Sequence, residues 1–312
     1  MKMTRRHFVG LTVAAASATA FGARLHAGDH AGDKNLAKPQ ANAGKIKATD
    51  RVALGKSGVK VSLVGVGTGS NGWAKASNQT RLGDRAFNHL MRHAFDNGIN
   101  FFDLADQYGS NPHFGRAMKG VARDKYVIQT KINSREPKAA RADIERILRE
   151  LKTDYIDAFI VHCVTESDWS TRFAPLLEEI SKFKAEGKIR AHGVTCHSFP
   201  ALQDAAKYDW VQINMVRWNN YQAHMDNDVE NCRKLFTQMR RKGQGMIGMK
   251  VVGQGDLLNG WRAKTPEECF RFQIESGVVD SFVVGCENTS HIDQLLKGTQ
   301  SALDELSYQV KI

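Results

Sequence analysis

Four residues that can transfer or orient protons stand near the ends of three consecutive hydrophobic runs. Asp103 and Tyr108 close the run at 100–104, Lys131 ends the run at 126–131, and His162 lies near the end of the run at 158–163. If these runs are neighbouring parallel strands of a barrel, their carboxyl ends meet at one rim. Because an unpaired charge is costly to bury, we expect these side chains to satisfy one another.

This combination is suited to donating a proton to a carbonyl oxygen. A Tyr hydroxyl has an ordinary pKa of about 10, which a nearby ammonium lowers. A carboxylate such as Asp103 would hold Lys131 charged and oriented, and His162 can share the same proton position. The result would be a general acid aimed at a carbonyl that accepts hydride from a reduced nicotinamide. Asp103 alone could equally be a loop cap and His162 alone a core histidine, so the grouping carries the prediction.

The elements that must position these residues alternate regularly from residue 60 onward. We predict strands at 63–67, 100–104, 126–131, 158–163, 190–195, 211–215, 246–250 and 282–286, with helices at 84–97, 113–120, 141–152, 173–186, 199–207, 229–242, 265–276 and 291–303. Eight strand–helix units in about 250 residues predict an α/β protein of the (β/α)8 TIM barrel type. The alternative is an open doubly wound sheet, but the run Gly65–Gly72 is a poor match to its dinucleotide fingerprint.

The composition is that of an ordinary globular protein. Of 312 residues, 42% are hydrophobic and 25% charged, which excludes a disordered or low-complexity chain. Five Cys are too few for a disulfide framework, and no apolar run of about 18 residues follows the first 30 positions. The net charge of +11 falls to +7 without the four basic residues of positions 1–27. We expect a solvated basic surface rather than a nucleic-acid site.

The first 27 residues are typical of an export signal rather than of folded structure. The pair Arg5-Arg6 with Phe8 precedes a weakly apolar stretch at 11–23 and is similar to a twin-arginine signal. An amphipathic first helix is the alternative, but the apolar run has no polar face. We expect cleavage between positions 18 and 27.

Three consequences follow from this signal. We expect a disordered leader at 28–50, a barrel domain at 51–312, and export to the periplasm, with no membrane span after signal removal. The resemblance to a twin-arginine signal implies that the protein folds before export, as proteins that hold a cofactor often do. It therefore favours a tightly held cofactor.

The order of the four residues resembles the aldo-keto reductase family. The resemblance rests on Asp103-Leu104-Ala105-Asp106-Gln107-Tyr108-Gly109, on Thr130-Lys131, on Ile156-Asp157-Ala158-Phe159-Ile160-Val161-His162, and on the opening at 54–62, which matches that family's lead-in hairpin. It implies a TIM barrel with a short N-terminal hairpin and an NAD(P)H-dependent oxidoreductase that interconverts an aldehyde, ketone or sugar and an alcohol. Tyr108 would be the proton donor, Lys131 and Asp103 would lower its pKa and orient it, and His162 would position the carbonyl.

The resemblance also implies which positions hold the cofactor. Gln212 matches the glutamine that contacts the nicotinamide amide, and Gly67 with Thr68 matches the turn beside the cofactor ribose. The other cofactor positions that it implies are Thr195, Met249, Lys250, Leu257, Gly285, Cys286, His291 and Gln294. The start of the last helix could bind a pyrophosphate through its free N–H groups.

Several of these positions depart from the family pattern. Thr195-Cys196 replaces a Ser-Asn pair, Met249 stands where an aromatic ring stacks, and His291 replaces an arginine. The basic residue that holds a 2′-phosphate is missing near Gly285, and Glu287 would repel that phosphate. We expect binding of a nicotinamide cofactor, and these departures leave NADP(H) only slightly favoured over NAD(H).

Three residues near the predicted strand ends are candidates for a substrate pocket. Trp73 lies in the loop after the first strand, which overhangs the barrel mouth, and His197 and Trp218 follow the fifth and sixth strands. A packed loop explains Trp218 equally well, and a loop hydrogen bond explains His197 equally well. The expected partner is a small-molecule carbonyl or alcohol.

A metal site is not expected at this rim. Cys163, Cys196, His197 and Cys286 lie near it, but their spacing matches no metal motif. If His162 points into the barrel, alternation along the strand predicts that Cys163 points away from it.

Two other functions are compatible with the same fold. A cofactor-binding or regulatory barrel with little turnover would explain the weakened cofactor positions, although the complete set of four residues disfavours it. A metal-dependent sugar isomerase would need carboxylates at the ends of strands five to eight, and those ends lack them.

Overall fold

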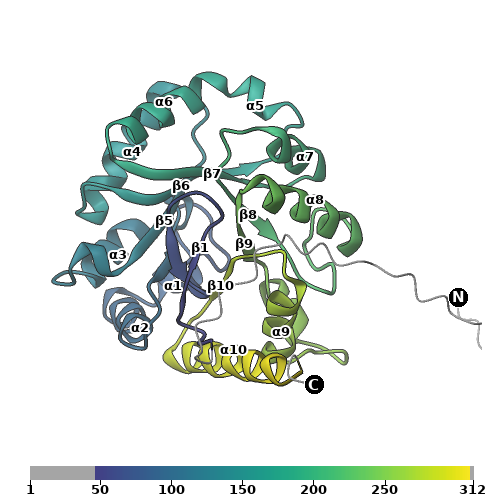
Figure 1. Ribbon diagram of the computed structural model, residues 1–312. Helices are drawn as coiled ribbons and strands as arrows, with labels where there is room; N and C mark the ends of the chain where they lie inside the picture. Colours follow the sequence, from purple (N-terminus) through teal and green to yellow (C-terminus); the bar gives the residue numbers. More distant parts are fainter. Residues whose placement is uncertain (1–45, 310–312) are drawn as a thin grey trace, which may run out of the picture. The chain divides into compact units, whose positions relative to one another are not determined.

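A closed barrel of eight parallel strands forms the centre of the protein (Figure 1). The computed structural model describes residues 46–309. The strands are β3 (Val64–Gly67), β4 (Phe101–Asp103), β5 (Val127–Ile132), β6 (Ile156–Val164), β7 (Ile189–Cys196), β8 (Ile213–Arg217), β9 (Gly245–Met249) and β10 (Ser281–Gly285). They pair in the order β10-β3-β4-β5-β6-β7-β8-β9. The predicted (β/α)8 barrel is confirmed.

Helices alternate with the strands and surround them (Figure 1). They are α1 (Asn78–Arg81), α2 (Asp84–Asp96), α3 (Ser110–Ala117), α4 (Pro137–Leu151), α5 (Trp169–Arg172), α6 (Ala174–Ala185), α7 (Phe199–Lys207), α8 (Val229–Lys242), α9 (Pro266–Ser276) and α10 (Thr289–Gln309), with short 3-10 helices η1 (Asp106–Tyr108), η2 (Arg123–Lys125) and η3 (Gly253–Leu258). Each predicted helix is present, with boundaries that differ by a few residues.

Alternation along the strands divides the apolar core into two parts. Phe102 and Ile128 point outward and pack in the layer between barrel and helices. Phe101, Ile160 and Met215 belong to a second cluster that fills the barrel interior. Neighbouring residues of one strand therefore serve different parts of the core, as the two-residue period of a strand requires.

A two-stranded hairpin covers the amino-terminal end of the barrel. β1 (Arg51–Ala53) and β2 (Lys60–Ser62) pair in antiparallel fashion, and Leu54 between them is fully buried. The backbone N–H of Lys56 donates to the carbonyl of Gly243, 2.8 Å away. Gly55 has a φ of 49°, and a Cβ there would lie 2.4 Å from the Gly243 oxygen, so the turn requires glycine. The hairpin implied by the family resemblance is present.

Residues 46–50, which we expected in a disordered leader, pack against the barrel domain. Ala48 is buried, and its N–H donates to Oε1 of Gln300 on α10. The Asp50 carbonyl accepts from the N–H of Leu63. The expectation is wrong for these five residues because the barrel domain supplies partners for their backbone. The predicted signal at 1–27 and the leader at 28–45 lie outside the described residues.

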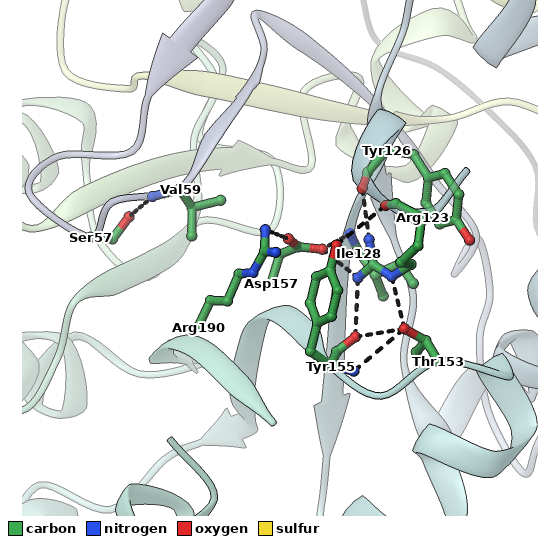
Figure 2. A network of polar contacts seen from close by, with 9 residues as sticks. All are labelled: Ser57, Val59, Arg123, Tyr126, Ile128, Thr153, Tyr155, Asp157 and Arg190. Atoms are coloured by element: carbon green, nitrogen blue, oxygen red, sulfur yellow. Dashed lines mark hydrogen bonds and ion pairs between the residues drawn. The ribbon is translucent and has the colours of Figure 1, made fainter. Parts of the chain in front are cut away.

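The amino ends of β5, β6 and β7 are joined by one buried carboxylate (Figure 2). Asp157 accepts from Nη2 of Arg123 at 2.6 Å, from Nη1 of Arg190 at 3.0 Å and from the N–H of Ile128 at 3.0 Å. Both guanidinium groups lie over the ring of Tyr155, at 4.0 and 3.8 Å from its centroid. This network is remote from the rim where the catalytic candidates lie. We therefore expect it to stabilise the barrel and not to take part in the reaction.

No helix in the described part of the chain is long and apolar enough to cross a membrane.

Candidate active site

A cavity opens at the carboxyl ends of the barrel strands. It is bounded by the ends of β3, β4 and β8 to β10, by the loops that follow β3 and β9, and by the first turns of α9 and α10. Eight of the residues predicted for the site line it: Gly67, Asp103, Tyr108, Met249, Lys250, Gly285, His291 and Gln294. The rule that barrel sites form at the carboxyl ends of strands therefore located this cavity.

Asp103 and Lys131 form a buried ion pair at its base. The Nζ of Lys131 donates to Oδ1 of Asp103 at 2.5 Å and to the carbonyl of Leu104 at 2.8 Å. Nε2 of Gln129 donates to the same carboxylate oxygen at 2.7 Å. Asp103 and Lys131 are 4% and 0% exposed, so each charge depends on the other for stabilisation.

The short helix η1 and two close glycines place the Tyr108 ring over this pair. The hydroxyl oxygen of Tyr108 lies 3.3 Å from Nε2 of His162, and Nζ of Lys131 lies 5.0 Å from the ring centroid. A Cβ at Gly69 or Gly72 would lie 2.3 or 2.4 Å from ring atoms of Tyr108, so these positions require glycine. The four residues predicted from strand ends are thus in contact.

Burial raises the pKa of Tyr108 well above its ordinary value, and the charge of Asp103 raises it further. The sequence-based expectation that the ion pair lowers this pKa is wrong for the protein alone. Burial also lowers the pKa of Lys131, although the nearby Asp103 carboxylate opposes that shift. The phenol is therefore an un-ionised donor throughout the neutral range.

His162 is held as a neutral imidazole. Burial lowers its pKa well below the ordinary value, and Lys131 and His197 add to the shift. Nδ1 faces Oδ1 of Asn133 at 3.3 Å, and because that oxygen can only accept, we assign the ring proton to Nδ1. Nε2 then accepts the hydrogen bond from Tyr108. Nη2 of Arg135 donates to the His162 carbonyl at 2.6 Å and fixes the end of β6.

Cys163 does not follow the alternation predicted for its strand. Its φ is 54°, and the pairing of β6 with β7 shifts register between Val161 and Val164. Its Sγ lies 3.8 Å from Nε2 of His197; burial raises the pKa of the thiol, and the charge of Lys131 opposes that shift. The prediction that Cys163 points away from the barrel lumen is wrong because a bulge breaks the two-residue period.

Gln212 and Trp218 are not part of the site. Gln212 precedes the first residue of β8 and lies at the opposite, amino-terminal end, where its Oε1 accepts from Nζ of Lys184 and the N–H of His192. Trp218 is 0% exposed, packs in the outer layer and donates from Nε1 to Ser276. Both predictions are wrong because β8 begins two residues later than expected.

Other predicted residues stand beside the cavity rather than along it. Thr68 donates to the carbonyl of Asp103, and Thr195 accepts from the N–H of Cys163, so both hydroxyls are used within the protein. Cys286 is fully buried, Leu257 packs on the outer core, His197 faces His162 with ring centroids 6.5 Å apart, and Trp73 is 72% exposed on the rim. None of these six lines the cavity.

Several lining residues were missed by sequence reasoning. They are Gly69, Ser70, Asn71, Asn78, Met215, Val251, Val252, Gln254, Gly255, Leu258, Pro266, Phe270, Val283 and Val284. Most belong to the loops after β3 and β9, which have no periodic pattern to read. Met215 could have been found as the inward-facing residue of β8. Glu287, noted from the sequence only as a phosphate-repelling residue, also lines the cavity.

The cavity has an apolar part and a polar part, and together they fit a nicotinamide dinucleotide. Met215, Met249 and Val283 offer an apolar wall beside Tyr108, as a nicotinamide ring requires. Toward α10, the cavity is lined by polar side chains and by the amino end of that helix. Free backbone N–H groups at a helix start can bind a phosphate. A Cβ at Gly285 would lie 2.2 Å from Oγ of Ser70, so a side chain at this lining position would displace Ser70.

In the described residues, no group of three or more His, Cys, Asp or Glu side chains is arranged to hold a metal ion.

Comparison with known proteins agrees with this fold. The model of the aldo/keto reductase family matches residues 63–271, and the chain belongs to that family. The Glycine max protein named "Probable aldo-keto reductase 1" is 29% identical over 243 residues, covering 72% of this chain and 67% of its own length. L-galactose dehydrogenase of Arabidopsis thaliana is 27% identical over 232 residues, covering 69% and 70%.

Two further comparisons give stronger support for the fold than for any particular substrate. The NADH-specific methylglyoxal reductase of Escherichia coli is 24% identical over 202 residues, covering 57% of this chain and 62% of its own. A solved aldo-keto reductase from Pseudomonas aeruginosa is 23% identical with a TM-score of 0.68, covering 82% of this chain and 97% of its own. The protein is therefore an oxidoreductase of the aldo-keto reductase type.

Proposed function

We propose that this protein interconverts a small carbonyl compound and its alcohol with a nicotinamide cofactor, and that Tyr108 is the proton donor. The observation that carries the proposal is the 3.3 Å contact between the Tyr108 hydroxyl and Nε2 of His162 beside the cavity. The buried, un-ionised phenol donates to Nε2 of His162. A substrate carbonyl oxygen bound beside the hydroxyl would replace Nε2 as the acceptor of that hydrogen bond.

The roles of the other residues follow from their contacts. A reduced nicotinamide in the cavity would supply hydride to the carbonyl carbon. As negative charge grows on the carbonyl oxygen, Tyr108 transfers its proton to it. The Lys131 ammonium, 5.0 Å from the ring centroid, stabilises the phenolate that results, and Asp103 holds that ammonium in place. Neutral His162 orients the hydroxyl and cannot compete as an acid.

We propose that the cofactor is NAD(H) rather than the NADP(H) that the sequence slightly favoured. Glu287 lines the cavity near the start of α10, and its Oε1 accepts from Nδ2 of Asn78 at 2.8 Å. A carboxylate there repels a 2′-phosphate and can accept from a free ribose hydroxyl. One relative, the Escherichia coli methylglyoxal reductase, is named as NADH-specific, which supports the same preference.

The cofactor proposal is tested by fluorescence titration with NADH and with NADPH separately. We expect saturable binding of both, with the lower Kd for NADH, and consumption of NADH when a simple aldehyde is added. Binding without consumption of any aldehyde would favour a cofactor-binding or regulatory barrel. Absence of binding by either nucleotide would overturn the proposed function.

We also propose that the mature protein is exported by the twin-arginine route. The support is the sequence pattern of positions 1–27, above all Arg5-Arg6. Replacing both arginines by lysine keeps the charge of the segment. The lysine variant should remain inside the cell, while the unchanged chain should fractionate with the periplasm. Equal export of the two chains would contradict the proposal.

A further inference from the structure

The mouth of the cavity beside the reacting residues holds a half-buried lysine without an acidic partner. Lys250 follows β9 and lines the cavity, and it has a φ of 57°, which non-glycine residues seldom adopt. Its carbonyl is fixed in this conformation by Nδ2 of Asn219 at 3.1 Å and by the N–H of Gly253 at 2.9 Å. A strained backbone that is held by dedicated hydrogen bonds indicates a functional position.

The groups around Lys250 make this mouth electropositive. Arg217 ends β8 directly opposite Met249, the residue before Lys250. Burial and, after it, the charges of Arg217 and Lys131 lower the pKa of Lys250 to about 8, while the nearby Cys163 opposes this shift.

The neighbouring cations are already paired, and Lys250 is not. Lys131 pairs with Asp103, and Arg217 pairs with the buried carboxylate of Asp226. Within residues 46–309, no carboxylate lies within ion-pair distance of Lys250. Two imidazoles close to the cavity, His162 and His197, are kept neutral by burial, with the pKa of His197 lowered to about 4. Among the described residues that line the cavity, Lys250 is therefore a cation without a carboxylate partner.

We propose that the substrate is an anionic carbonyl compound whose carboxylate or phosphate group ion-pairs with Lys250. The inference rests on the proposed function and narrows its substrate class. Lys250 lies among the groups that surround His162 and Cys163, whereas the polar side chains Asn78, Glu287 and His291 lie toward α10. An anion at Lys250 would thus place its carbonyl near Tyr108, while the cofactor phosphates would occupy the α10 end.

The test compares matched substrates that differ in charge. The full chain with saturating NADH is given benzaldehyde and its para-carboxy derivative, and separately glyceraldehyde and its phosphate ester. Lys250→Met keeps the length of the side chain and removes its charge. Lys264→Met is the control, because it removes the same charge from a lysine that stands over Tyr221 and does not line the cavity.

We expect Lys250→Met to lower kcat/KM for the anionic member of a pair about tenfold or more, mainly through KM, because one charge-assisted contact is lost. The neutral member should lose much less, so the ratio of kcat/KM for the two members should fall about tenfold, whereas Lys264→Met should leave that ratio unchanged. A loss of kcat/KM seen only with the carboxylate pair identifies a carboxylate as the group that Lys250 binds. A loss seen only with the phosphate pair identifies a phosphate. Equal loss for charged and neutral substrates, or a raised Kd for NADH, would overturn the inference and make Lys250 a cofactor contact.

If the unchanged chain reduces no aldehyde, the proposed function fails and the anion site is tested by binding. Benzoate, inorganic phosphate and uncharged benzyl alcohol are titrated calorimetrically into the NADH-loaded protein and its Lys250→Met variant. Tighter binding of either anion, lost in the variant, supports the site by itself. Equal binding by the two chains would overturn it.

Discussion

The Tyr108 hydroxyl and the His162 imidazole meet at 3.3 Å at the edge of the cavity, and burial shifts their pKa values in opposite directions. The phenol keeps its proton to high pH, and the imidazole stays unprotonated to low pH. The pair therefore holds one transferable proton, on the tyrosine, across the neutral range. This division supports the proposal that Tyr108 is the donor and that His162 orients it.

The ion pair beneath the tyrosine should behave as one unit in stability. Because both partners are buried, Lys131→Met should lower the free energy of unfolding by about 3–5 kcal/mol, leaving an unpaired carboxylate. Replacing Asp103 by Leu as well should recover part of that loss. Urea denaturation of the single and double variants measures both effects. A double variant less stable than Lys131→Met would contradict the account.

Glu287 should control the choice of cofactor. Glu287→Gln removes the negative charge but keeps the hydrogen-bond acceptor for Asn78, so the Kd for NADPH should fall about tenfold while that for NADH changes little. Glu230→Gln, on the exposed face of α8, is the matched control. Fluorescence titration gives both constants. An unchanged ratio of the two Kd values would show that Glu287 does not face the 2′ position.

His192 should make the protein acid-labile. It is buried and stacked 4.0 Å from Trp210, and burial lowers its pKa from 6.5 to about 4. The unfolded chain therefore binds the proton first, so the stabilisation is full above pH 6.5 and is lost as the pH falls toward 4. By pH 5 this residue should cost about 2 kcal/mol.

The measurement is urea denaturation at pH 8 and pH 5. His162 and His197 shift in the same direction, so the unchanged chain should lose stability for more than one reason. His192→Phe keeps the stacking and should show a smaller loss between the two pH values. The same loss in the variant would exclude His192 as a source.

Asp157 should matter for stability and not for chemistry. Asp157→Asn leaves two guanidinium groups over Tyr155 without their shared carboxylate, and the free energy of unfolding should fall by about 3 kcal/mol (Figure 2). The kcat of the folded variant should stay unchanged because the network is at the opposite end of the barrel. Asp124→Asn, at an exposed position, is the control. A selective loss of kcat would contradict this division.

The sequence predicted the barrel and the cluster of candidate catalytic residues because both depend on where strands end. Hydrophobic runs locate strands, and parallel strands bring their carboxyl ends together, so the sequence alone is enough to group Asp103, Lys131 and His162. Errors arose where a small shift in register matters. β8 begins at Ile213, so Gln212 lies at the amino-terminal end of the barrel and not at the carboxyl end, where it was predicted.

Two other features could not be inferred from sequence patterns. The bulge after Val161 turns the Cys163 thiol toward His197, and no residue type signals it. The direction of the pKa shift of Tyr108 depends on how completely the ring is covered, which Gly69 and Gly72 decide through contacts between segments distant in sequence. Hydrophobic periodicity indicates which helices and strands form. Burial of a polar group depends instead on how those elements and their loops pack around it.

The central claim is that Tyr108 delivers the proton, and the Tyr108→Phe variant tests it most directly. Steady-state reduction of an aldehyde by NADH should lose about 100-fold or more in kcat, while the Kd for NADH stays within about twofold. Tyr126→Phe, which changes another buried tyrosine far from the cavity, should leave kcat unchanged. Near-normal turnover by Tyr108→Phe would contradict the account and assign the proton to another group.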